Sequence, residues 1–206
     1  MSLLETRFKQ LLQRIVGQVT PEKYTEIAEK YSEPQRHYHN IVHIEACLRE
    51  LDQAHEHIPH PDLVETAIWF HDIIYEPKGS DNEERSAEYA CKVLFAHGVD
   101  HGTVDKIKAM ILATKHRETS TDQDTGALLD IDLAILGKPM AIFQSYMDEI
   151  RREYRWVPDE QYKESRKRVL EGFLKRRSIY STEYFRDKYE SKARRNLQRA
   201  IKKLEL

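Results

Sequence analysis

The stretch Leu63–Ile74, LVETAIWFHDII, is strongly apolar, yet it contains a His-Asp pair beside aromatic and aliphatic residues. With almost no polar face left for solvent, it predicts the most buried helix of the fold. The pair, His71 and Asp72, is anomalous there, because burying an imidazole and a carboxylate costs several kcal/mol unless something compensates. A divalent cation compensates well, since it binds both neutral imidazole and carboxylate.

Apolar residues recur at helical spacing on both sides of this stretch. At the amino-terminal end, Gly17 closes one predicted helix and Thr20-Pro21 opens another. The remaining predicted helices cover about 41–54, 83–96, 103–115, 125–136, 141–155, 159–177 and 182–204. We find no strand of useful length and no internal repeat, and only 7 Gly and 7 Pro occur in 206 residues. The sequence therefore predicts an all-α fold.

The composition limits the class of protein. A chain of 206 residues, 40% apolar and 33% charged, is long enough for one domain with a core beneath a charged surface. No run approaches 18 consecutive apolar residues, so we expect no membrane span. The amino-terminal stretch carries Glu5 and no signal-like apolar run, and the two cysteines, Cys47 and Cys91, are isolated. We therefore expect a cytoplasmic protein without a disulfide framework or a thiolate zinc site.

Charge and histidine are unevenly distributed. Residues 1–150 contain 15 Lys and Arg against 26 Asp and Glu, whereas residues 151–206 contain 18 against 9. Nucleic-acid binding is one interpretation of the basic end. However, acids alternate with its basic residues and its apolar positions keep a helical period, which favours a solvated outer layer. All ten histidines lie between His37 and His116, and histidine is the commonest metal ligand. The sequence leaves homo-oligomerisation open.

Two further segments carry polar residues of the kind found in His71-Asp72. His43 opens a predicted helix 28 residues earlier, and Asp130 and Asp132 lie in the apolar segment LLDIDLAILG. Two carboxylates in such a helix repel each other unless a cation or a protonation shift relieves them. Two His and two Asp around one octahedral ion leave two positions free, as in a catalytic site. Mn²⁺, Fe²⁺, Ni²⁺, Co²⁺, Mg²⁺ and Zn²⁺ all suit these ligands.

Four blocks in this order, RHYHNIVHI, WFHDIIY, DNEERSAEYA and LLDIDLAILG, give the chain a family resemblance. It resembles the HD superfamily of metal-dependent phosphohydrolases, and within it a bacterial branch, over about residues 30–140. The resemblance implies a single HD-type helical domain over 1–206, with the metal-site core at 30–140 and a basic helical extension over 141–206. It also implies one divalent metal ion held by His43, His71, Asp72 and Asp132, with Asp130 as the alternative to Asp132.

Polar residues around these blocks are candidates for the reaction itself. The candidate catalytic residues, which would orient water or move a proton, are Glu76 and His116. The candidate substrate-binding residues, which would contact phosphate or line the pocket, are Arg36, His39, Asn40, Arg85 and Lys115. Ordinary loop and helix-capping roles compete with each of these assignments, most of all for the helix start DNEERS.

The leading hypothesis is a metal-dependent phosphohydrolase that acts on a nucleotide or another small phosphate ester through a metal-activated water. One alternative is a non-catalytic module that senses a nucleotide or binds RNA through its basic helices. Another is a di-iron oxygenase of the same fold, which the scarcity of further histidines between His71 and Asp132 disfavours.

Overall fold

The computed structural model describes residues 2–16 and 21–205. In this part of the chain it contains ten α-helices, two short 3₁₀ helices and no strand, so the all-α prediction is confirmed there. The helices are α1 (Leu3–Val16), α2 (Pro21–Lys30), α3 (Ile41–Ala54), η1 (His55–His57), α4 (Pro61–Phe70), α5 (Asn82–Ala96), α6 (His101–Ala113), α7 (Gln123–Asp132), η2 (Leu133–Gly137), α8 (Met140–Glu153), α9 (Asp159–Lys175) and α10 (Glu183–Leu204). Gly17 and Thr20 lie outside the described residues. None of the described helices has the length and apolar character needed to cross a bilayer.

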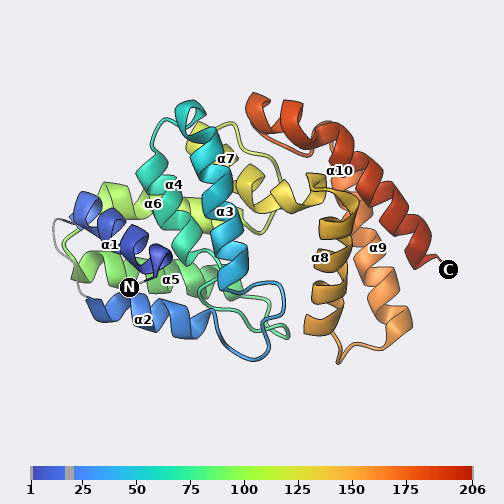
Figure 1. The fold of residues 1–206 in the computed structure, drawn as a ribbon, viewed down its shortest axis with the longest axis horizontal. Coiled ribbons are helices and arrows are strands. Elements are labelled where there is room, and N and C mark those ends of the chain that lie inside the picture. The colour runs from blue at the N-terminus through green and yellow to red at the C-terminus, as the bar shows by residue number, and fades with distance from the viewer. Residues whose placement is uncertain (1, 17–20, 206) are drawn as a thin grey trace.

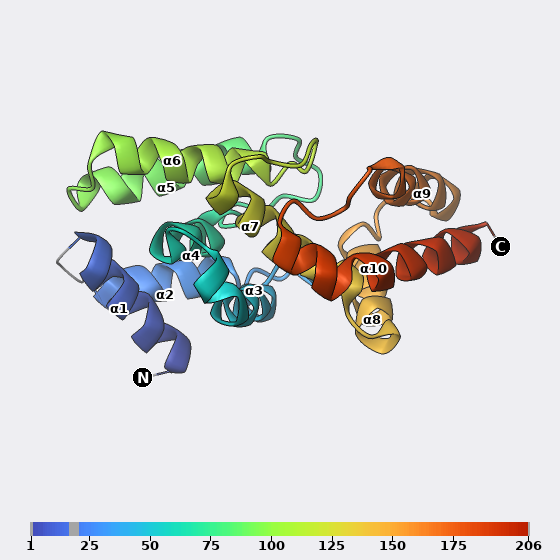
Figure 2. The same ribbon diagram turned by 90° about the horizontal axis from the view of Figure 1, so that it is seen from above.

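Helix α4 lies at the centre of the amino-terminal helices. Every residue from Val64 to Phe70 is buried, as its uniformly apolar sequence predicts. The helix packs against α1, α3, α5, α6 and α7. Seen from above, it lies between the α5–α6 pair on one side and α1 and α2 on the other (Figure 2).

The predicted extension of this helix to Ile74 is wrong, because α4 ends at Phe70. Arg36 donates hydrogen bonds to two backbone carbonyls that follow the end of the helix. Its Nη1 donates to the carbonyl of Asp72 at 2.7 Å and its Nη2 to that of Ile73 at 3.0 Å. The hydroxyl of Ser86 accepts from the backbone N–H of Ile74 at 3.1 Å. Since other segments satisfy these backbone groups, the chain turns there without losing hydrogen bonds.

The predicted helix over 125–136 is also shorter than expected. α7 ends at Asp132 and the chain tightens into η2. The hydroxyl of Tyr180 donates to the carbonyl of Leu133 at 3.1 Å, and Nδ2 of Asn196 donates to that of Leu136 at 2.8 Å. The other predicted helices that lie within the described residues differ from the observed bounds by only a few residues.

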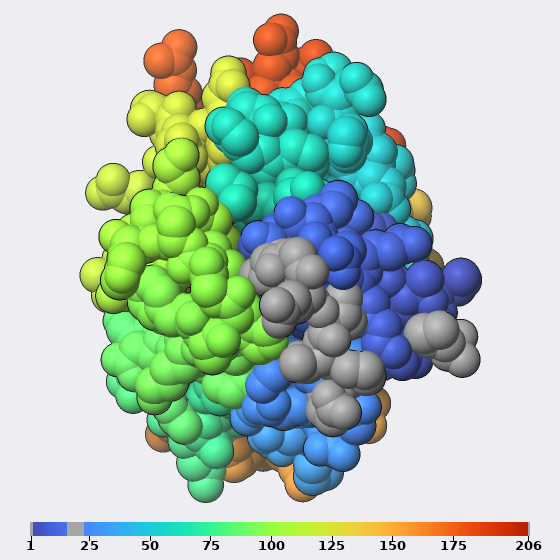
Figure 3. All heavy atoms as spheres, turned by 90° about the vertical axis from the view of Figure 1, so that its left-hand side faces the viewer, coloured from blue at the N-terminus to red at the C-terminus, as the bar shows by residue number. Residues whose placement is uncertain are grey.

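The carboxyl-terminal helices form a layer against η2 and α3. Figure 1 shows α8, α9 and α10 together on the side opposite α1 and α2, and α10 packs along both η2 and α9. Figure 3 looks onto the side where α1 and α2 lie, and there the atoms of α8, α9 and α10 appear only at the edge of the molecule. Phe185, Tyr189 and Leu197 of α10 belong to the same hydrophobic core as α4. Residues 141–205 therefore share one core with the rest of the described chain.

Two contacts fix this layer closely. Glu50 of α3 is 2% exposed and accepts hydrogen bonds from Lys138, from Nζ of Lys188 at 2.9 Å and from the Tyr189 hydroxyl at 2.9 Å. Gly137 lies against the same tyrosine: a Cβ atom added there would be 2.5 Å from the Tyr189 Cβ. Only glycine permits this approach.

Candidate metal centre

Four polar side chains from three separate segments converge at the ends of buried helices. His43 lies in the first turn of α3, which Asn40 caps by accepting from the backbone N–H of Val42 at 2.9 Å. His71 and Asp72 follow the last residue of α4, and Asp132 is the last residue of α7. The helices bring together groups up to 89 positions apart in the sequence.

The distances between the ligating atoms suit a single ion. His43 Nε2 lies 3.2 Å from His71 Nε2 and 3.2 Å from Asp132 Oδ1. Asp72 Oδ2 lies 3.1 Å from His71 Nε2 and 3.7 Å from His43 Nε2. Ligands bound to one ion at about 2.1 Å are roughly 3 Å apart. Three of the four, His43, His71 and Asp132, form a group that could hold a metal ion.

The two carboxylates of this cluster favour a positive charge beside them. Burial lowers the pKa of His71, but the neighbouring carboxylates of Asp72 and Asp132 outweigh it and raise that pKa to about 9. Burial acts in the opposite sense on Asp72, yet its contact with His71 holds the pKa of its carboxyl below the ordinary value. A proton on His71 thus offsets part of the negative charge of the two carboxylates, and a divalent ion bound there would displace it.

Groups behind the cluster orient its ligands. His71 Nδ1 donates to the carbonyl of Ile68 at 2.9 Å, which directs Nε2 into the cluster. His116 Nε2 lies 2.6 Å from Asp132 Oδ2, and the carboxylate can only accept in this contact. His116 has a φ of +52°, in the left-handed region that only a few per cent of non-glycine residues adopt. The loop after α6 thus holds this imidazole against Asp132.

His39 lies beside the cluster, and the sequence analysis missed the residue that holds it there, Glu153 of α8. Glu153 is 4% exposed; its Oε1 accepts from the backbone N–H groups of residues 37–39 at 2.7 to 3.0 Å. Its Oε2 accepts from His39 Nδ1 and from the Tyr75 hydroxyl, each at 2.7 Å. The one local signal was a carboxylate in the last turn of a helix, where the dipole disfavours it.

The other predicted site residues lie outside the cluster. The side chain of Arg36 is fully buried, and its guanidinium donates to Glu33 and to the carbonyls of residues 39, 72 and 73. Glu76 is exposed and accepts from the backbone N–H of Lys78 in its own loop. Lys115 pairs with Glu84, and the side chain of Arg85 is 50% exposed. The structure therefore gives Arg36 and Asn40 structural roles and leaves His39 and His116 near the ligands.

Asp130, the alternative ligand, points elsewhere. It is fully buried, and its carboxylate accepts from the backbone N–H of Ser181 at 2.6 Å and from the N–H and hydroxyl of Thr182, each at 2.7 Å. Burial raises the pKa of Asp130 to about 6 despite these hydrogen bonds. Its role is to attach α7 to the segment that leads into α10.

A cavity of about 290 Å³ adjoins the cluster. His43 and Asp132 contribute to its lining, together with Tyr38, Tyr146 and the apolar side chain of Ile135. The volume is close to the lower limit for small-molecule sites. A small organic group therefore has room beside the candidate ligands.

Comparison of the chain with protein-family models, curated proteins and solved structures gives no match. Interpretation of the centre therefore depends on the geometry described above.

Proposed function

We propose that this chain is a metal-dependent phosphohydrolase of the HD type, acting on a nucleotide or another small phosphate ester. The observation that carries the proposal is the convergence of His43, His71, Asp72 and Asp132, with interatomic distances of 3.1 to 3.8 Å for the five His–carboxylate and His–His contacts. The substrate class comes from the family resemblance alone. The cavity beside His43 supports the proposal because it gives a small ester access to the centre.

The donor set fits a divalent ion, with two imidazole nitrogens and two carboxylate oxygens and without a thiolate. A bound ion would lower the pKa of a coordinated water and neutralise charge on a phosphoryl oxygen. The protein residues supply the remaining functions. His116 holds Asp132 in place, and the carbonyl of Ile68 fixes the orientation of His71.

His39 is the group best placed to move a proton. Glu153 holds its Nδ1, and no described residue forms a hydrogen bond with its Nε2. Burial lowers the pKa of His39, but the carboxylates of Asp72 and Glu153 outweigh it and raise that pKa above its ordinary value. These carboxylates favour the protonated ring, whose N–H can donate to a leaving oxygen, as a general acid requires.

The test compares two aspartates that lie two residues apart. Metal-stripped protein is reloaded with Mn²⁺, Mg²⁺, Ni²⁺ or Co²⁺ and assayed against nucleotides and phosphomonoesters. We expect His71→Ala and Asp132→Asn to lose bound metal and to lower turnover by at least about 100-fold, because each removes a ligand. Asp130→Asn is the matched control and is expected to retain the metal, since Asp130 binds only residues 181 and 182.

All assays are run well below each variant's unfolding transition, because Asp130→Asn removes a buried clamp. Metal content, measured by elemental analysis, separates loss of ligand from loss of fold. If Asp132→Asn bound as much metal as the unmodified protein, the proposed centre would be wrong. Absence of hydrolysis with every ion, together with salt-sensitive RNA binding that survives His71→Ala, would favour the non-catalytic alternative.

A further inference from the structure

A second cavity, of about 520 Å³, lies between the loop after α6 and the carboxyl-terminal half of α9. Five basic residues line it, and none of its lining residues is an aspartate or a glutamate. These basic residues are Lys115, Arg117, Arg168, Lys175 and Arg176. We call it the basic cavity. A concave surface whose charged lining residues are all cations raises the local concentration of anions.

Three of these cations have no carboxylate of a described residue within 4 Å: Arg117, Lys175 and Arg176. Lys115 pairs with Glu84, and Arg168 lies 3.6 Å from Glu164. Three of the five basic side chains of the basic cavity therefore lack a direct ion pair with a described residue.

Arg176 is the most constrained of them. Its guanidinium carbon lies 4.6 Å from the centroid of the Phe173 ring, and its Nη2 donates to the carbonyl of His116. Burial lowers the pKa of Arg176, and no carboxylate counteracts this effect. A partly buried cation that is held in place without an anion is costly unless an anionic ligand satisfies it.

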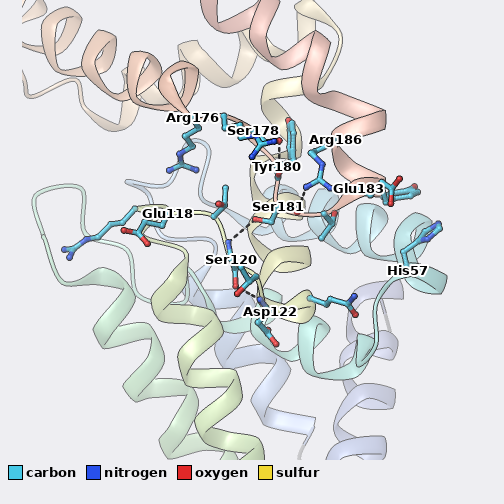
Figure 4. Close-up of a pocket in the computed structure, with 17 residues that line it drawn as sticks. His57, Glu118, Ser120, Asp122, Arg176, Ser178, Tyr180, Ser181, Glu183 and Arg186 are labelled. Atoms are coloured by element: carbon cyan, nitrogen blue, oxygen red, sulfur yellow. Dashed lines mark hydrogen bonds between the residues drawn. The ribbon is translucent and has the colours of Figure 1, made fainter.

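The basic cavity adjoins the candidate metal centre through one residue. His116 lines the cavity, and its Nε2 lies 2.6 Å from Asp132 Oδ2. The cavity also shares Arg117 and Arg176 with a larger cleft, of about 1000 Å³, between residues 117–123 and 176–186. Figure 4 shows this cleft, with Arg176 on its left side and Arg186, Glu183 and His57 on its right side. The basic cavity and this cleft therefore adjoin each other, and the acidic residues Glu118, Asp122 and Glu183 line the cleft but not the basic cavity.

We propose that the basic cavity binds non-reacting phosphate groups of the substrate, which therefore carries at least two linked phosphates. This inference rests on the proposed hydrolase function for the link to catalysis, but not for the binding itself. The volume suits a small oligophosphate group, since small-molecule sites measure about 300–1,000 Å³. Arginine above all matches phosphate oxygens, because its planar fork donates two parallel hydrogen bonds.

The first experiment measures binding without any metal. Calorimetric titration of the EDTA-treated protein with inorganic tripolyphosphate is compared with titration with orthophosphate. We expect tripolyphosphate to bind at least about tenfold more tightly, and Arg176→Gln to weaken it by about tenfold, as loss of a charge-assisted contact predicts. Arg176→Lys should recover part of the affinity, because it keeps the charge but not the fork.

Two further variants separate charge from structural damage. Arg176 also donates to the His116 carbonyl, so Arg176→Gln can disturb the loop. Lys175 is exposed and has no carboxylate of a described residue within 4 Å, so Lys175→Gln removes only charge from the basic cavity, and we expect a severalfold weaker affinity. Arg199→Gln, on the exposed face of α10, is the matched control and should leave the affinity within twofold. Equal effects of Lys175→Gln and Arg199→Gln would overturn the proposal.

The second experiment links the cavity to turnover in the metal-loaded protein. We expect Lys175→Gln and Arg176→Gln to lower kcat/KM for a nucleoside triphosphate about tenfold more than for a phosphomonoester. Hydrolysis of both substrates with an unchanged ratio would remove this inference and leave the proposed function intact. If the chain hydrolyses nothing but the variants lose tripolyphosphate binding, the basic cavity stands as a phosphate site and the proposed function is wrong. A single-stranded oligonucleotide that outcompetes tripolyphosphate would also overturn the inference.

Discussion

Glu153 shows how much one carboxylate can organise. Through two oxygens it holds three consecutive backbone N–H groups, the ring of His39 and the hydroxyl of Tyr75. Burial alone would raise its pKa, but these hydrogen bonds, led by the one from His39, outweigh burial and lower the pKa of Glu153 to about 2. The loop before α3 therefore depends on the ionised form of a residue more than 100 positions away.

This pKa predicts a dependence of stability on acid. Because the folded value lies below the ordinary 4.5, ionised Glu153 stabilises the fold above about pH 4.5, and the effect is lost as the pH falls towards 2. The full contribution is roughly 3 kcal/mol, of which about 2 kcal/mol disappears between pH 6 and pH 3. Urea unfolding should therefore show the gap between the unmodified protein and Glu153→Gln narrowing by about 2 kcal/mol over that range.

Glu164→Gln is the control for that measurement, because the Glu164 side chain is 72% exposed. Its free energy of unfolding should follow that of the unmodified protein throughout. A gap for Glu153→Gln that stays constant from pH 6 to pH 3 would show that the carboxylate does not titrate as described.

At the level of single residues, the sequence indicated site residues where a polar side chain lies among apolar neighbours in the chain. His71 and Asp72 are polar groups in an apolar segment, and the structure brings them together with His43. The choice between Asp130 and Asp132 stayed open, because both are equally anomalous locally. Residues two positions apart on a helix point about 200° away from each other, so the carboxylates of Asp130 and Asp132 face different partners. Only the tertiary structure shows which of them faces the histidines.

Among the elements, α7 and η2 connect the candidate centre to the carboxyl-terminal layer. Asp132 ends one and Gly137 ends the other, five residues later. Helical periodicity predicted the existence of nearly every helix, since the apolar stripe is a local pattern. It could not predict that α4 ends at Phe70 or that α7 passes into η2 after Asp132. Side chains distant in the sequence, Arg36, Tyr180 and Asn196, donate hydrogen bonds to the backbone carbonyls at these points.

Gly137 predicts a measurable effect at the contact of η2 with α10. Gly137→Ala would place a methyl group 2.5 Å from the Tyr189 Cβ, an atom that cannot move without α10. We expect the free energy of unfolding to fall by at least about 2 kcal/mol. Gly172→Ala, in the last turn of α9 with no atom within 4 Å of the added Cβ, should instead stabilise by roughly 0.5–1 kcal/mol. Chemical denaturation of both variants tests this contrast, and equal effects would contradict it.

The whole molecule has one hydrophobic core, although its charge is divided along the sequence. The acidic part spans residues 1–150 and the basic part residues 151–206. The two parts meet through buried contacts, in which Glu50 of α3 binds Lys188 and Tyr189 and Asp130 binds Thr182. Composition gave the charge division but not these partners, which depend on how α10 lies across η2.

A shared core predicts cooperative unfolding of the whole chain. Calorimetry should show one transition whose calorimetric and van't Hoff enthalpies agree, at about 140 kcal/mol near 60 °C for a chain of this length. The contacts between Glu50 and α10 prevent the carboxyl-terminal layer from separating first. Two resolved transitions, or a van't Hoff enthalpy near half the calorimetric one, would contradict this expectation.

The clamp of Asp130 on Thr182 also affects the order of events during translation. All four candidate ligands have been synthesised once the ribosome passes Asp132, yet Glu153 and the segment that fixes α7 are still untranslated. On a nascent chain of that length, α7 lacks the hydrogen bonds that Asp130 makes to residues 181 and 182. If the proposed function is correct, ion capture should be a late event in biogenesis, completed after α10 has emerged and docked.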